Sequence, residues 1–223
     1  MMSDCANVSA RQYPLGRLAA TIALLFATSI TQAAEPPCAR PECTGGWEDR
    51  DIPVALGWTS PECGSLCNAV VKLKWRSCND KCEIFIKVIE FDPVHCTCPR
   101  DMLGQRAIEA ALFTMADVCG PSSGGCVTDT RVMIEACMSF ITICVGGNCT
   151  LMLQPCNFGG DLDAIGAHSC CSADYKVCSG PQGKYIATIT NNGVFGPPCP
   201  PLDVNGNECM SGCLLLPPVR QLQ

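Results

Sequence analysis

The side chains on which most metal and redox sites depend are scarce in this chain. Its 223 residues include only two histidines, His95 and His168, and no two cysteines stand in a C-x-x-C spacing. Structural zinc sites combine closely spaced Cys thiolates, often with His, and dithiol redox enzymes use the C-x-x-C pair. The sequence therefore disfavours a zinc site and a disulfide-exchange enzyme, and we expect no cofactor.

Groups that bind phosphate are also few. No glycine-rich phosphate loop occurs, and the chain after residue 33 holds 13 basic and 20 acidic side chains, a net charge of −7. Affinity for nucleic acid rests on Lys and Arg side chains that neutralise phosphates. We therefore expect no nucleic-acid partner.

Long apolar runs are confined to the N-terminus. Arg11 and Arg17 flank the start of an uncharged stretch of 13 residues, 18–30, and residues 31–33 (TQA) place small side chains before a cleavage point. This order is typical of a secretory signal peptide. Thirteen helical residues cover roughly 20 Å, less than the ~30 Å hydrocarbon core, although an uncleaved membrane anchor is the alternative. We expect residues 1–33 to be a signal peptide and the mature chain, without a membrane span, to be secreted, extracellular or periplasmic.

Cysteine, by contrast, is abundant: the chain has 21, and 20 of them follow residue 37. Disulfides persist outside the reducing cytosol, and an even set of 20 allows up to ten. The expected disulfide cysteines are Cys38, Cys43, Cys63, Cys67, Cys78, Cys82, Cys96, Cys98, Cys119, Cys126, Cys137, Cys144, Cys149, Cys156, Cys170, Cys171, Cys178, Cys199, Cys209 and Cys213. Their connectivity stays open, because the sequence does not determine it.

Apolar periodicity predicts an α+β fold. Residues 34–62 are rich in Pro, Gly and acidic side chains, which indicates an irregular segment pinned by Cys38, Cys43 and Cys63. We expect residues 63–223 to form a single disulfide-rich domain. Its predicted elements are an antiparallel sheet of about six strands in three hairpins (69–91, 130–156 and 173–190) and one packed helix at about 101–119, where apolar residues recur at i, i+3 and i+4.

A row of basic residues runs along the first predicted hairpin. Lys72, Lys74 and Arg76 alternate with apolar residues in a strand. The row is either a binding stripe or a solvated strand face whose charges pair with Glu83 or Glu90 across the hairpin. We favour the second interpretation.

The first and third hairpins share a loose pattern. Residues 67–98 and 171–199 each begin with a Cys, carry a mid-strand Lys, close the strand on a Cys and then reach a Pro and another Cys. Either an internal duplication or the common needs of disulfide-clipped hairpins explains this echo. It falls short of the repeat number that a solenoid needs.

Candidate functional residues lie in two polar stretches. His168 follows Asp161 and Asp163 in a Gly-rich loop, so these residues are the candidates for acid–base catalysis. Asp161 and Asp163, and likewise Asp203 and Asn205, offer oxygen ligands to calcium. Ordinary turn chemistry explains the same residues, so each assignment is a hypothesis.

These observations favour a secreted structural or protein-interaction protein without catalytic activity, whose partner is an extracellular protein or surface component. One alternative is a secreted hydrolase that uses His168 with the nearby Asp residues. A further alternative is a small inhibitor or effector that acts through an exposed loop, for which residues 157–169 are the best candidate.

Overall fold

The structure is a computed structural model that describes residues 35–36, 38–78, 81–119, 126–157, 169–179, 185–195 and 199–217. Of residues 58–59, 116–117, 126–129, 176–179 and 185–195 it describes the backbone alone. The signal peptide expected at residues 1–33 lies outside this part of the chain. The elements all belong to one compact unit, Pro36–Gln223.

The described elements confirm a disulfide-rich α+β fold with one long helix. In chain order they are β1 (Glu48–Ala55), α1 (Leu56–Thr59), η1 (Pro61–Cys63), β2 (Asn68–Cys78), β3 (Lys81–Phe91), α2 (Arg100–Cys119), β4 (Cys126–Glu135), β5 (Cys137–Val145), β6 (Asn148–Pro155), β7 (Cys170–Ser179), β8 (Tyr185–Phe195), β9 (Cys209–Ser211) and η2 (Gly212–Leu215). Within the described residues, no helix combines the length and the apolarity that crossing a membrane requires.

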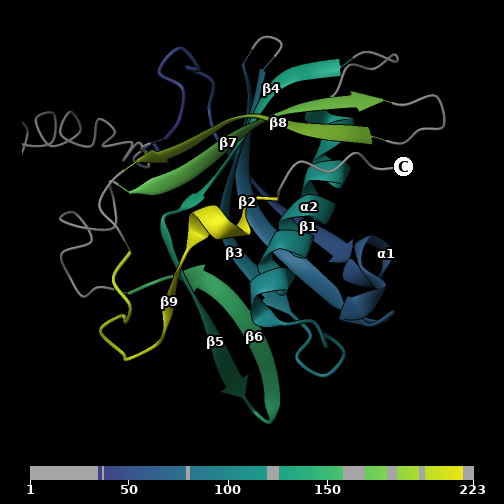
Figure 1. Cartoon of the computed structure of the whole chain (residues 1–223), viewed down its shortest axis with the longest axis vertical. Helices are drawn as coiled ribbons and strands as arrows, with labels where there is room; N and C mark the ends of the chain where they lie inside the picture. The colour runs from purple at the N-terminus through teal and green to yellow at the C-terminus, as the bar shows by residue number, and fades with distance from the viewer. Residues whose placement is uncertain are drawn as a thin grey trace, which may run out of the picture. The chain divides into compact units, whose positions relative to one another are not determined.

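The sheet branches at β3. On one side β3 pairs with β2, which in turn pairs with β1. On the other side, residues 82–86 of β3 pair with β4, and residues 89–91 pair with β6. One arm therefore continues from β4 to β7 and β8, and the other continues from β6 to β5 and β9 (Figure 1).

The three predicted hairpins are present as β2/β3, β5/β6 and β7/β8. The sheet also has strands that the sequence pattern does not predict. The stretch from residue 130 to 145, which belongs to the second predicted hairpin, is divided at Ala136 into β4 and β5, which lie in different arms. β4 pairs with β3 in parallel, because α2 carries the chain back across the sheet between them.

β1 lies within the segment that the sequence indicates to be irregular. It carries four exposed residues, 48–51, and an exposed proline, Pro53, so only Ile52 and Val54 are buried. A strand that pairs on one side can contain a proline, because its other edge needs no amide donor. The proline and the charged residues of this stretch therefore belong to an edge strand and not to a loop.

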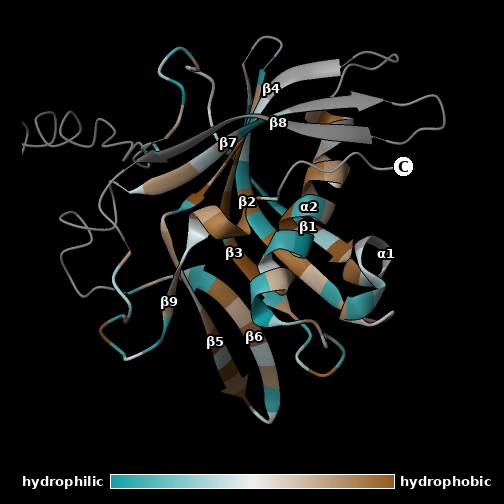
Figure 2. Ribbon diagram, viewed as in Figure 1, coloured by the Kyte–Doolittle hydropathy of each residue, from teal (hydrophilic) through white to brown (hydrophobic). Residues whose placement is uncertain are grey.

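α2 covers one face of the sheet. Its buried Leu103, Ile108 and Met115 join Val71 and Ile89 in the main core. These helix residues follow the predicted period, and the observed helix agrees with the expected one at 101–119 to within a residue. Figure 2 shows hydrophobic residues concentrated on β3 and alternating with hydrophilic ones along α2, as such packing requires.

The opposite face of the sheet carries a second, smaller core. Residues 38–47 lie over it, and Cys38 packs with Met133 of β4 and Cys170 of β7. Trp47 and Phe85 pack against this cluster. The sheet is thus covered by α2 on one face and, at the β3–β4–β7 end, by the N-terminal segment on the other.

Nine cysteine pairs at disulfide distance hold these layers together. They are Cys38–Cys170, Cys43–Cys78, Cys63–Cys98, Cys67–Cys96, Cys82–Cys119, Cys137–Cys199, Cys144–Cys149, Cys156–Cys209 and Cys171–Cys213. The side chains of Cys126 and Cys178 lie outside the described residues. The backbone places these two cysteines opposite each other in the β4–β7 ladder.

The cysteine pairing differs between the two hairpins of the sequence echo. Cys67 pairs with Cys96 inside the first copy. The matching cysteines of the second copy, Cys171 and Cys199, pair instead with Cys213 and Cys137. The disulfide pattern therefore gives no support to a duplication.

Candidate functional site

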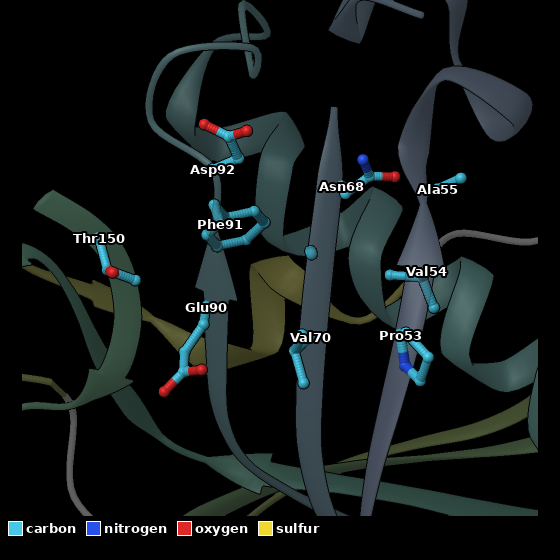
Figure 3. A pocket seen from close by; sticks show the side chains of 10 residues that line it. Pro53, Val54, Ala55, Asn68, Val70, Glu90, Phe91, Asp92 and Thr150 are labelled. Carbon is cyan, nitrogen blue, oxygen red and sulfur yellow. The ribbon is translucent and has the colours of Figure 1, made fainter. Parts of the chain in front are cut away.

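A groove of about 480 Å³ crosses the sheet where β1 ends and β2 begins. The residues that line it are Pro53, Val54 and Ala55 of β1, Asn68, Ala69 and Val70 of β2, Glu90 and Phe91 of β3, Asp92, and Thr150 of β6 (Figure 3). Val70 and Glu90 alternate with Val71 and Ile89 of the main core, so the side chains of Val70 and Glu90 lie on the face of the sheet opposite that core. The groove offers a mostly apolar floor with two carboxylates.

Both carboxylates have a cationic or imidazole neighbour. Glu90 accepts a salt bridge from Lys72 at 2.7 Å. Asp92 lies 2.5 Å from His95 Nδ1 and accepts a hydrogen bond from the Val94 amide. The hydrogen bond from His95 is the largest effect that lowers the pKa of Asp92, followed by the Val94 amide. Asp92 is therefore ionised at neutral pH.

Two disulfide-clamped loops border this groove. The loop before Asn68 is joined to the loop after Asp92 by Cys63–Cys98 and Cys67–Cys96. Each loop exposes a large apolar side chain: Leu66 is 62% exposed and Val94 is 77% exposed. The two disulfides hold the backbone of both loops, so the side chains of Leu66 and Val94 stay exposed to solvent.

Within the described residues, His95 is the histidine that lies beside a carboxylate. His168, Asp161 and Asp163 lie outside the described residues, so acid–base catalysis by them stays a prediction. A proximity signal for His95 was present in the sequence, because Asp92 precedes it by three residues within a turn.

A short serine motif lies between α2 and β4 in the sequence. Residues 120–124 (GPSSG) have the G-x-S-x-G spacing of a hydrolase nucleophile turn. That turn joins a strand to a following helix, whereas this segment follows α2 and precedes β4. The order of the flanking elements does not favour a nucleophile, and residues 120–124 lie outside the described part of the chain.

The calcium candidates Asp203 and Asn205 form a tight turn. Asp203 Oδ1 accepts hydrogen bonds from the backbone amides of Asn205 at 2.8 Å and Asn207 at 2.9 Å. The Asn207 side-chain amide also donates to both carboxylate oxygens. That side-chain hydrogen bond is the largest cause of the lowered pKa of Asp203. These donors occupy the oxygens that a cation would use, so the contacts support a turn, and calcium at Asp203 and Asn205 stays a prediction.

Metal ligands do not gather elsewhere in the described residues, where no group of three or more His, Cys, Asp or Glu side chains could hold an ion. Asp161 and Asp163, the other calcium candidates, are outside that search.

The basic row on β2 is divided between two environments. Lys72 pairs with Glu90, as the cross-hairpin interpretation expects. Arg76 also pairs across the hairpin, with Glu83 at 2.6 Å, but both side chains are fully buried. The row is therefore not a continuous binding stripe.

Arg76 and Glu83 belong to a buried polar network that the sequence does not reveal. Glu83 Oε1 accepts a hydrogen bond from the Arg40 amide at 2.7 Å, and the Arg40 side chain donates to Asp174 at 3.0 Å. Arg131 binds both oxygens of Asp174. The Arg76 guanidinium also lies 4.4 Å from the centre of the Trp47 ring. This network fixes the N-terminal segment to β2, β3, β4 and β7.

Comparison with known proteins gives no relative from which a function could be taken: no family model matches the chain, and no curated protein or solved structure shows significant similarity to it.

Proposed function

We propose that the chain is a secreted, disulfide-stabilised protein that acts by binding an extracellular protein, without catalysis. The observation that carries this proposal is the set of nine cysteine pairs. Eight of them join residues at least 29 positions apart in sequence. Such pairs form and persist in oxidising compartments. The signal-like residues 1–33 support the same destination.

The groove and its clamped loops are the proposed interaction surface. Its apolar floor next to exposed Leu66 and Val94 provides the kind of surface that marks protein–protein contacts. The ordering of flexible loops is a main entropic cost of association. Because disulfides already hold both loops, binding would cost little conformational entropy there. The whole-chain charge of −6, with Glu90 and Asp92 at the groove, favours a partner patch that is apolar with a basic rim.

A matched pair of variants tests this surface. Val70→Arg places a charge on the groove floor, whereas Leu202→Arg replaces a side chain that is 53% exposed and lies outside the groove. The oxidised wild-type chain and both variants would be immobilised and exposed to extracellular proteins from the native source. We expect one protein to be retained by the wild type and by Leu202→Arg, and lost with Val70→Arg.

Equal retention by both variants, with circular dichroism showing that both are folded, would remove the groove as the interaction surface. Turnover of a peptide, ester or glycoside substrate by the purified chain would contradict the non-catalytic proposal.

A further inference from the structure

We propose that the Cys144–Cys149 pair is a reversible thiol–disulfide exchange site for a small thiol. It is the only one of the nine described pairs in which both cysteines are exposed. In each of the other eight, at least one cysteine is buried. Exchange requires a thiolate to approach a sulfur in line with the S–S bond, so access controls its rate.

The pair lies on the part of the β5–β6 hairpin that extends beyond its neighbour. Phe91, the last residue of β3, is opposite Leu151. Residues 148–150 of β6 and 143–145 of β5 continue past that point, and Cys144 faces Cys149 across the ladder. Figure 1 shows this hairpin projecting from the lower arm of the sheet. A thiol can therefore reach the sulfurs without movement of any other described element.

No charged side chain of the hairpin itself repels a thiolate. Residues 136–157, which include the whole hairpin, contain no Asp, Glu, Lys, Arg or His. An incoming anion therefore meets no like charge within the hairpin, although the chain as a whole carries −6.

The hairpin also allows the bond to re-form. Gly146 and Gly147 have φ values of +59° and +86°, which two-residue turns of the mirror-image type require. Backbone pairing on both sides of this turn keeps Cys144 opposite Cys149 after reduction. The bond closes a loop of only five positions, so among the described pairs it restricts the unfolded chain least and its loss costs the least stability.

The exchange balances in two steps. A small thiolate attacks one sulfur of the pair, the S–S bond breaks, and the other cysteine leaves as a thiolate that takes a proton from water. A second small thiolate then attacks the mixed disulfide, which releases the small-molecule disulfide and leaves Cys144 and Cys149 as thiols. Two thiols are oxidised and one protein disulfide is reduced; the reverse steps restore it.

This inference rests on the proposed function, in which the secreted chain is disulfide-linked. Reduced glutathione is the small thiol that tests it. The oxidised chain from residue 34 onward, which omits Cys5 of the proposed signal peptide and so holds 20 cysteines, is treated with increasing glutathione, quenched with N-ethylmaleimide at set times and mapped by peptide mass spectrometry. We expect Cys144 and Cys149 to be labelled at least about tenfold faster than any other cysteine, because access governs exchange. Circular dichroism should not change, and oxidised glutathione added before the quench should restore the disulfide and so prevent the labelling.

Two variants sharpen this test. With oxidised glutathione, Cys149→Ser should form a mixed disulfide at Cys144 and release one reduced glutathione, and Cys144→Ser combined with Cys149→Ser should fold and lose the early labelling. The inference is overturned if another pair is labelled as fast, or if these two cysteines react only as the protein unfolds. Free thiols in the untreated protein would contradict the disulfide-linked scaffold itself, whereas a fully oxidised but unreactive chain would contradict this inference alone.

Discussion

The buried polar network contains five charged side chains, and residues that pair within it lie far apart in sequence. Arg40 and Asp174 are 134 positions apart, and Arg131 and Asp174 are 43 apart. A buried ion pair contributes little net stability when intact, but removal of one partner leaves the other charge buried and unpaired. Each member of this network is therefore more important to the fold than its charge alone indicates.

Glu83 provides the sharpest test at the scale of a single residue. Glu83→Ala removes the carboxylate that pairs with the fully buried Arg76 and accepts from the Arg40 amide. We expect a loss of about 3–5 kcal/mol in the free energy of unfolding. The control, Lys87→Ala, breaks an exposed pair with Asp49 and should cost less than about 1 kcal/mol. Urea unfolding with the disulfides intact measures both, and equal small losses would refute the role of the network.

Glu135 provides a second residue-scale test, in pH dependence. Burial raises the pKa of its carboxyl to about 7. Because the folded chain holds this proton more tightly than the unfolded chain, ionisation destabilises the fold increasingly from about pH 4.5 to about pH 7. Glu135→Gln should therefore raise stability at pH 8, by at most about 3 kcal/mol, and change it little at pH 4. A stabilisation of the same size at both pH values would contradict the burial effect.

The pKa of Asp174 is shifted in the direction opposite to that of Glu135. Burial tends to raise the pKa of its carboxyl, but the hydrogen bonds and charges of Arg131 and Arg40 outweigh burial and lower that pKa. Its contribution to stability is therefore complete above the ordinary carboxyl range and is lost as the pH falls through the lowered pKa.

At the scale of elements, η2 packs unusually close to the end of β4. A Cβ atom on Gly212 would lie 2.0 Å from the backbone oxygen of Glu135, and the Gly212 amide donates to Ala136 at 2.7 Å. Backbone cannot move aside as a flexible side chain can. Gly212→Ala should therefore destabilise the protein by roughly 1–3 kcal/mol, as overpacking does, and lower the thermal midpoint.

Gly46→Ala is the matched control, because a Cβ there meets no atom within 4 Å. An unchanged midpoint in Gly212→Ala would show that η2 does not dock as described.

The elements also show what sequence reasoning can and cannot reach. The long helix and three hairpins follow from local apolar periodicity, so they could be predicted. β1 could not, because Pro53 and four charged residues hide an edge strand whose stability comes from β2. The parallel pairing of β3 and β4 was missed because it depends on where α2 returns the chain, which no local pattern records.

The candidate site likewise has parts that the sequence predicts and parts that it does not. Pairing of Lys72 with Glu90 could be predicted, because long side chains reach diagonal neighbours across a hairpin. The groove could not, because it combines residues 53–55, 68–70, 90–92 and 150 from four strands. The buried network joins segments even further apart, so only the tertiary structure reveals it.

At the scale of the whole molecule, disulfides join every layer of the fold. Individual disulfides contribute about 2–4 kcal/mol by restricting the unfolded chain, although nine or more do not add linearly. An ordinary domain is stable by only about 5–15 kcal/mol. We therefore expect full reduction to unfold the protein, as monitored by near-ultraviolet circular dichroism, even though reduction of Cys144–Cys149 alone should not. A native spectrum after complete, thiol-verified reduction would contradict this expectation.

Disulfide mapping of the chain isolated from the extracytoplasmic fraction of its native source tests the central claim most directly. The account predicts a mature N-terminus at Ala34, no free thiol among the 20 cysteines that follow residue 37, the nine pairs of the structure, and a tenth pair of Cys126 with Cys178 from their register in the β4–β7 ladder. Retention of the chain in the cytosol with free or metal-bound thiols, or a different connectivity in the purified protein, would contradict it.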